Sequence, residues 1–175
     1  MRHLLRDRRG VAASEFAMSL PFLVLLYIGG YQLSDAISAY RKVAVATRTV
    51  ADLTSQYTSV SDDDVNEILD ASAQVLAPYK VSAAKLLVSQ IKIDASGTST
   101  VDWSFGKNIT RLSQGTPFTL PASVRTPNSY VIVASINYTY TPVTASGMIG
   151  TIPFQDQIIM GPRSSVEVDC RTCSN

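Results

Sequence analysis

The sequence has one histidine, two cysteines and few charged residues. The histidine is His3, so the body of the chain cannot form a Ser-His-Asp or Cys-His catalytic pair or a histidine-based metal site. Carboxylate-only or lysine-based chemistry stays open in principle, but no pattern favours it, and we expect a protein that is not an enzyme. Charged residues make up 17% of the 175 residues and hydrophobic residues 46%, while soluble domains average about 25% charged. The excess of apolar residues therefore needs a location.

The net charge of +1 is the sum of two unlike parts. Arg2, Arg6, Arg8 and Arg9 against Asp7 give the first ten residues a charge of +3, so the rest of the chain sums to −2. That remainder lacks the clustered lysine and arginine of a nucleic-acid-binding surface. We therefore expect no nucleic-acid partner.

The excess apolar residues lie in one segment near the N-terminus. Residues 16–33, FAMSLPFLVLLYIGGYQL, contain no charge, and a helix of that length covers roughly 27 Å, enough to span a bilayer. Arginines precede it, so the positive-inside rule predicts a cytoplasmic N-terminus and a body on the other side. Pro21 is expected to bend this helix. A cleaved secretory signal is an alternative, because Ser34-Asp35-Ala36 offers a small-x-small site.

Glu15 stands at the start of this apolar segment. A carboxylate there is costly in a membrane unless it has a cationic partner. Placement among lipid headgroups beside the arginines is one explanation. The surrounding sequence offers another: a basic leader, Gly10, four further residues, then Glu15-Phe16 opening an apolar helix. This pattern resembles the type IV prepilins.

The prepilin resemblance implies a processing step and an assembly role. In that family a membrane-embedded aspartyl peptidase cuts after the glycine, which here lies between Gly10 and Val11. Glu15 would then be the fifth mature residue. The family's glutamate is thought to pair with the new α-amine of a neighbouring subunit. The resemblance therefore assigns Glu15 and Phe16 to registration between subunits.

Further segments resemble the TadE/TadG-like pilus assembly proteins of the tight-adherence (Flp) pilus. They are EFAMSLPFLVLLYIGGYQL, RKVAVATRTVADLTSQ, INYTYTPV and GPRSSVEVDC. The chain has no insertion large enough for a von Willebrand-type domain, so a TadE- or TadF-type pseudopilin is the better match. The resemblance implies a minor pilin for pilus assembly and adhesion, without a cofactor. Its implied partners are the membrane, a prepilin peptidase, other pilins and the pilus-assembly platform.

We predict three parts of the chain: a cytoplasmic leader at 1–10, a transmembrane helix at 11–34 and a periplasmic α+β domain at 35–175. The protein would be a single-pass inner-membrane protein that can enter the pilus. The helix is expected to continue to about residue 57, because apolar side chains recur at helical spacing. That stripe comprises Tyr40, Val43, Thr47, Val50, Leu53 or Thr54, and Tyr57. Packing on the chain's own sheet is favoured for it, and contact with other subunits is compatible.

A second helix is predicted over 62–77. Ser61 and Asp64 form a capping box at its start, and Pro78 ends it. The three consecutive aspartates at 62–64 lack the alternating ligands and the turn glycine of a calcium loop. We therefore expect no metal site there.

Strand patterns begin at about residue 84. LLVSQIKID and STVDWSF predict a hairpin, and the Gly- and Pro-containing segment after it is expected to cover a sheet edge. YVIVASINYTYT predicts a central strand, with the even-numbered residues 130–140 on one side and Val131 and Val133 on the other. PFQDQIIM follows, and RSSVEV is a candidate for a last short strand. The predicted fold is α+β, with helices on one face of a mainly antiparallel sheet of four to five strands.

Cys170 and Cys173 lie close to the C-terminal end of the sequence. No βαβ unit surrounds them, which argues against a thioredoxin-like redox site, and a metal site would need two further ligands. With the body outside the cytoplasm, a disulfide that fastens the C-terminal tail is favoured. Pairing between subunits stays open.

A second functional hypothesis also fits the sequence. It is a membrane-anchored or secreted envelope protein whose periplasmic domain binds a ligand or partner and never enters a filament. The aromatic residues on the predicted strands could form such a binding face, although placement in the core is favoured. They are Trp103, Phe105, Tyr138 and Tyr140.

Overall fold

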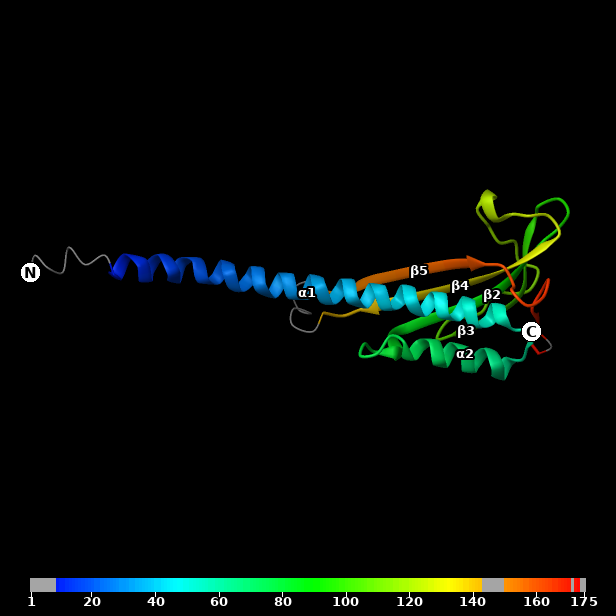
Figure 1. The fold of residues 1–175 in the computed structure, drawn as a ribbon, viewed down its shortest axis with the longest axis horizontal. Helices are drawn as coiled ribbons and strands as arrows, with labels where there is room; N and C mark the ends of the chain where they lie inside the picture. Colours follow the sequence, from blue (N-terminus) through cyan, green and yellow to red (C-terminus); the bar gives the residue numbers. More distant parts are fainter. Residues whose placement is uncertain (1–8, 143–149, 171, 174–175) are drawn as a thin grey trace, which may run out of the picture.

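The computed structural model describes residues 9–142, 150–170, 172 and 173. A long helix projects from a two-layer domain, in which two helices cover one face of a four-stranded sheet (Figure 1). This arrangement is the predicted α+β fold. Most of the predicted leader, residues 1–8, lies outside the described residues.

Helix α1, Arg9–Gln56, is 48 residues long and roughly 72 Å in length. It starts two residues before the predicted residue 11 and ends one residue before the predicted residue 57. Figure 1 shows it as a single helix, uninterrupted at Pro21 and across the predicted domain boundary at residue 34. The N-terminal half extends beyond the domain, while one face of the C-terminal half is buried against it, from Gln32 and Ala39 onward.

Burial on α1 follows the predicted stripe in its middle and departs from it at the ends. Val43, Thr47 and Val50 are fully buried, as is Thr54 rather than Leu53. Tyr40 and Tyr57 remain more than 40% exposed. The helix approaches the sheet through small side chains that carried little hydrophobic signal in the sequence. These are Ala39, Ala46, Ala51 and Ser55.

Helix α2, Asp62–Gln74, begins with the predicted capping box. The Ser61 hydroxyl accepts a hydrogen bond from the Asp64 N–H, and the Asp64 carboxylate accepts one from the Ser61 N–H at 2.8 Å. Hydrogen bonds that the Asp64 carboxylate accepts from the Ser61 hydroxyl, at 2.6 Å, and from the Ser61 N–H hold the pKa of Asp64 below its usual value. The α-helix ends three residues before the predicted residue 77. From 75 to 77 each N–H bonds to the carbonyl three residues back, and the chain tightens into turns before Pro78.

The main sheet is antiparallel, with strand order β3-β2-β4-β5. Its strands are β2 Ala84–Ile93, β3 Ser99–Lys107, β4 Ser129–Tyr140 and β5 Ile152–Met160. β2 and β3 form the predicted hairpin, and β4 is an inner strand, as expected. The hairpin turn is held by the Asp94 carboxylate, which accepts hydrogen bonds from the Ser96 and Thr98 N–H groups. Gly97 in this turn has a φ of +81°.

The two faces of the sheet bury separate apolar clusters. On the helical face, Ile132, Ala134 and Ile136 of β4 pack with side chains from α1 and α2. Val131 and Val133 point to the opposite face, as the alternation predicted. There they meet the irregular connection between β3 and β4, which includes the short 3-10 helix η3, Ala122–Val124.

That connection covers more than the predicted sheet edge. It pairs with β3 through the Thr100–Pro117 bridge, and Leu120 is buried beneath it. Another short 3-10 helix, η2 Val81–Ala83, leads from α2 into β2. The connection between β3 and β4 therefore covers the face of the sheet that the two helices leave open.

The predicted last strand at 163–168 is wrong. Those residues form bends, and the strand follows at β6, Asp169–Cys170, which pairs in parallel with β1, Ser59–Val60. Two-residue strands have no readable alternation, and the two partners are about 110 positions apart. The sequence pattern therefore contained no signal for this pairing.

Candidate assembly site along the N-terminal helix

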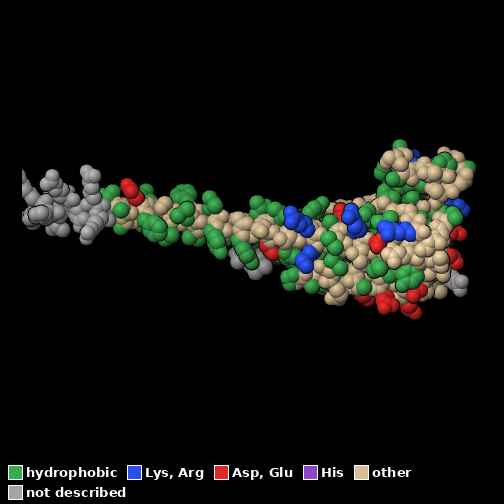
Figure 2. Space-filling model, viewed as in Figure 1, with side chains coloured by type: hydrophobic (Ala, Val, Ile, Leu, Met, Phe, Trp, Pro, Cys, Tyr) green, Lys and Arg blue, Asp and Glu red, His purple; other side chains and the backbone are tan. Residues whose placement is uncertain are grey.

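The projecting half of α1 is covered with exposed apolar side chains. Met18, Phe22, Leu26 and Tyr27 are each at least 75% exposed, and Figure 2 shows an apolar surface along the projection. A domain that functions alone in water rarely exposes so much apolar surface. Within the described part of the chain, Val11–Gln56 is the one helical stretch long and apolar enough to cross a membrane. This arrangement supports a single membrane anchor.

The residues of the predicted processing and registration motif lie at the far end of this projection. Gly10 belongs to α1, and Val11 and Phe16 are 55% and 60% exposed. The Glu15 side chain is exposed and has no hydrogen bond or ion pair with any other described residue. It therefore lies away from the chain's own domain, where a cation from another molecule can reach it.

A polar clasp, formed by Asp35, Tyr79 and Tyr140, joins α1 to the domain where the helix reaches it. The Tyr79 hydroxyl donates to Asp35 Oδ1 at 2.8 Å, and the Tyr140 hydroxyl donates to Asp35 Oδ2 at 2.5 Å. Burial, reinforced by the Asp35 carboxylate, raises the pKa of Tyr79 to about 12 and also raises the pKa of Tyr140. Both phenols therefore remain protonated donors near neutral pH.

The polar clasp has no signal in the sequence. Tyr79 and Tyr140 lie 44 and 105 positions after Asp35, and no local pattern connects them. Aromatic packing extends the same contact, because the Tyr140 ring stacks on Phe154 of β5 at 5.6 Å between centroids and meets Tyr79 edge-on. These contacts join Asp35 of α1 to the turn after α2 and to β4. They therefore fix the direction in which α1 leaves the domain.

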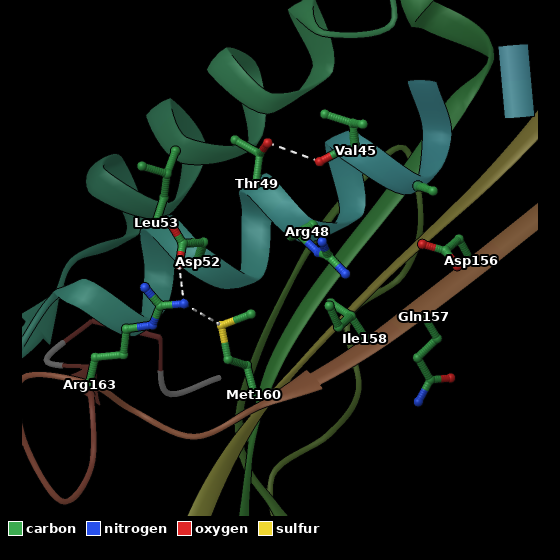
Figure 3. A pocket seen from close by; sticks show the side chains of 11 residues that line it. Val45, Arg48, Thr49, Asp52, Leu53, Asp156, Gln157, Ile158, Met160 and Arg163 are labelled. Carbon is green, nitrogen blue, oxygen red and sulfur yellow. Dashed lines mark hydrogen bonds and ion pairs between the residues drawn. The ribbon is translucent and has the colours of Figure 1, made fainter. Parts of the chain in front are cut away.

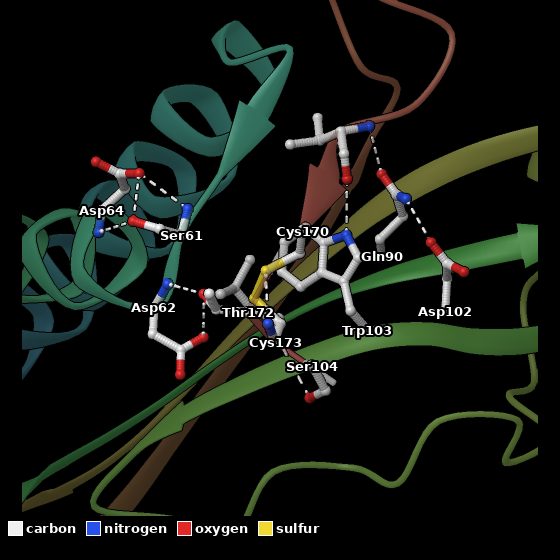
Figure 4. Close-up of a disulfide and its surroundings, with 12 residues drawn as sticks. Ser61, Asp62, Asp64, Gln90, Asp102, Trp103, Ser104, Cys170, Thr172 and Cys173 are labelled. Atoms are coloured by element: carbon white, nitrogen blue, oxygen red, sulfur yellow. Dashed lines mark hydrogen bonds between the residues drawn. A yellow bond between two sulfur atoms is a disulfide. The ribbon is translucent and has the colours of Figure 1, made fainter. Parts of the chain in front are cut away.

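The C-terminal tail lies on the sheet beside the start of α2 (Figure 4). A disulfide joins Cys170 to Cys173, and Cys173 is buried in the main core. Trp103 Nε1 donates to the Val168 carbonyl, and the Val168 N–H donates to Gln90 Oε1, both at 2.8 Å. These bonds attach the tail to β2 and β3.

The tail also brings Asp62 near the two sulfur atoms. The Asp62 carboxylate and both Sγ atoms lie within 4.8 Å of one another, which supplies one of the additional ligands that a metal site would need. The Asp62 carboxylate also accepts a hydrogen bond from the Thr172 hydroxyl at 3.1 Å, and the two sulfur atoms are bonded to each other. In this form the cluster fastens the tail at the start of α2.

The aromatic residues considered as a binding face belong mainly to the core. Trp103, Tyr138 and Tyr140 are each no more than 5% exposed, and Phe105 packs against the same cluster. They cannot form an open surface for a ligand. The alternative of an aromatic binding face is therefore wrong for these residues.

A groove of about 900 Å³ runs between α1 and β5 (Figure 3). Apolar side chains from both elements line it, together with the arginines Arg48 and Arg163. Arg163 pairs with Asp52 at 2.7 Å and also donates to the Met160 sulfur. This groove was not visible in the sequence, because its two walls come from segments about 100 residues apart.

An exposed apolar helix with a charged end, continuous with an α+β domain, is the arrangement of single-helix membrane-anchored proteins. The family described as TadE-like protein matches residues 10–52, which include Gly10, Glu15 and most of α1. The predicted resemblance to TadE-like proteins is thus confirmed over that segment. Searches of curated proteins and of solved structures gave no match.

Proposed function

We propose that the protein is a non-enzymatic minor pilin or pseudopilin of a tight-adherence pilus. Helix α1 anchors it in the inner membrane with its N-terminus in the cytoplasm, and the α+β domain lies in the periplasm. A prepilin peptidase cuts between Gly10 and Val11. The observation that carries the proposal is the single unbroken helix with the glycine-to-glutamate spacing at one end and the domain at the other.

The continuity of α1 weighs against a secreted protein. Cleavage after Ala36 would cut within the helix and remove Asp35, which accepts hydrogen bonds from Tyr79 and Tyr140. Two buried phenols would then lose their acceptor, an unfavourable change. An anchored envelope protein that stays outside any filament is the remaining alternative. It differs by keeping the Gly10–Val11 bond intact.

Mass spectrometry of the mature N-terminus in the native host tests the processing step. We expect Val11 as the first residue. A Gly10→Leu variant is expected to remain uncut, because glycine lets the backbone extend closely into a protease cleft and a branched side chain does not. An intact N-terminus in the unmodified protein, or cleavage after Ala36, would refute the processing step.

A Glu15→Ala substitution tests the registration role. Membrane insertion should be unchanged or improved, because a carboxylate at the bilayer centre costs about 2.5–3.5 kcal/mol and less near the interface. Piliation should fall sharply, because no anion remains for a neighbour's α-amine. Membrane fractionation and electron microscopy measure the two effects. Ser14→Ala is the matched control, since among the described residues the Ser14 hydroxyl bonds only to the Val11 carbonyl. Normal piliation in Glu15→Ala would show that the role is wrong.

A further inference from the structure

The helical layer of the domain is unequal at its two sides. α1 packs over β4 and β5, and α2 packs beside α1 and contacts β3. Beyond α1, next to the edge strand β5, no second helix lies among the described elements (Figure 1). The groove between α1 and β5 occupies this position. It has room for the side chains of one more helix along α1.

Exposed arginines follow the outer flank of α1 beside this groove. Arg48 lines the groove, and Arg41 lies two turns earlier on the same face of α1. Both are exposed, and their side chains have no ion pair or hydrogen bond with other described residues. Val45, 54% exposed, lies between them. Of the two acids in the groove, Asp52 is already paired with Arg163, and Asp156 stands on the opposite wall.

The outer face of α2 is acidic. Asp63, Glu67 and Asp70 are exposed at i, i+4 and i+7, while the opposite face of the helix is buried. Within the described structure only Asp70 has a partner, Lys107. Figure 2 shows basic side chains along α1 and acidic ones gathered at the other border of the helical layer.

The two rows match in spacing as well as in charge. Arg41 and Arg48 are seven residues apart, as are Asp63 and Asp70, and seven residues correspond to about 10.5 Å along a helix. The basic row and the acidic row lie on opposite sides of the molecule, so the two rows of one chain cannot contact each other. Only another molecule can bring them together.

We propose that the acidic outer face of α2 in one copy docks into the groove between α1 and β5 of a second copy. Exposed ion pairs are individually weak, so the contact depends on several of them together, and their spacing sets its orientation and register. The contact joins unlike surfaces, so its repetition produces a ring or an open chain rather than a two-fold dimer. The inference rests on the proposed function and adds the surfaces through which copies meet.

Charge reversal in the full-length protein, in detergent micelles and in membranes, tests this contact. The double variant Arg41→Glu/Arg48→Glu has two acidic rows, and Asp63→Arg/Glu67→Arg has two basic rows. Each variant alone should self-associate at least tenfold more weakly than the native protein, as measured by sedimentation at low salt. An equimolar mixture should recover association, because the rows are then complementary again. Arg111→Glu/Arg125→Glu, which changes exposed arginines of the β3–β4 connection, is the matched control and should associate normally.

Carbodiimide crosslinking of an Arg48→Lys variant locates the contact. We expect amide bonds from this lysine to Asp63 or Glu67, with products larger than dimers. Protein with natural nitrogen is mixed with protein labelled with heavy nitrogen. Crosslinks that contain both isotopes join two molecules, whereas crosslinks within one molecule contain only one. Unchanged association of the reversed variants, failure of the mixture to recover, absence of mixed-isotope crosslinks, or products that stop at a dimer would each overturn the proposal. The proposed function is tested separately, by Val11 as the mature N-terminus and by loss of piliation in Glu15→Ala. If those two results hold and the association tests fail, the interface is wrong and the proposed function stands.

Discussion

At the scale of single residues, Asp35 accepts hydrogen bonds from Tyr79 and Tyr140 and links the anchor to the domain. The pKa of Tyr79, raised to about 12, favours the protonated phenol in the folded state. This stabilisation is complete below the ordinary pKa of 10.0 and is lost as pH rises toward 12. We predict that Asp35→Asn lowers the pKa of Tyr79, because the nearby charge no longer opposes ionisation. Burial, the larger cause, keeps the value above 10.0.

Tyrosinate absorbance of the full-length protein in detergent, followed through alkaline pH, measures this shift. Tyr57→Phe removes an exposed phenol and is the control. It should leave the late-titrating phenols in place. An identical late titration in Asp35→Asn and in the native protein would mean that Asp35 does not influence the phenols.

At the scale of elements, α1 lies close to β4 and β5 because its buried face is built from small residues. Ala46 is fully buried in that face. Ala46→Leu adds three carbons where no space exists, and we expect a loss of about 1–3 kcal/mol in the free energy of unfolding of the domain. Urea denaturation followed by circular dichroism measures it. The matched control is Ala71→Leu on the exposed face of α2, which should change stability by less than about 0.5 kcal/mol. Equal effects of the two substitutions would refute the close packing of α1.

At the scale of the whole molecule, the charge balance depends on whether the leader remains. The precursor carries +1, and removal of residues 1–10, with their charge of +3, leaves side chains that sum to −2. We predict that the mature protein has a more acidic isoelectric point than the uncut Gly10→Leu variant. Isoelectric focusing in detergent compares them directly. Equal isoelectric points in a strain with an active prepilin peptidase would contradict the removal of the leader.

Local patterns predicted much of the fold. The alternation in β4 correctly assigned Ile132 and Val133 to opposite faces, and Ser61 with Asp64 correctly marked the start of α2. The end of α2 was misplaced because three turn bonds replace the last helical bonds before Pro78. Such bonds depend on the direction that the chain takes next, which helical periodicity does not contain.

The candidate site divides in the same way. Gly10, Val11, Glu15 and Phe16 form a contiguous motif, and the structure adds only that their end of α1 stands away from the domain. The polar clasp, the groove and the attachment of the C-terminal tail had no local signal. Each brings together side chains from distant parts of the chain, whose meeting depends on how the sheet and helices pack.

The sequence by itself determined a long apolar helix, the glycine-to-glutamate spacing at its start and an α+β domain after it, because helical and strand periodicities and charge distribution are local properties. Only the tertiary structure decided that α1 is one spine held to the domain through Asp35, and that its outer flank leaves a groove beside β5. Those features arise from packing between segments far apart in the chain. The same packing leaves a basic row and an acidic row on opposite sides of one molecule.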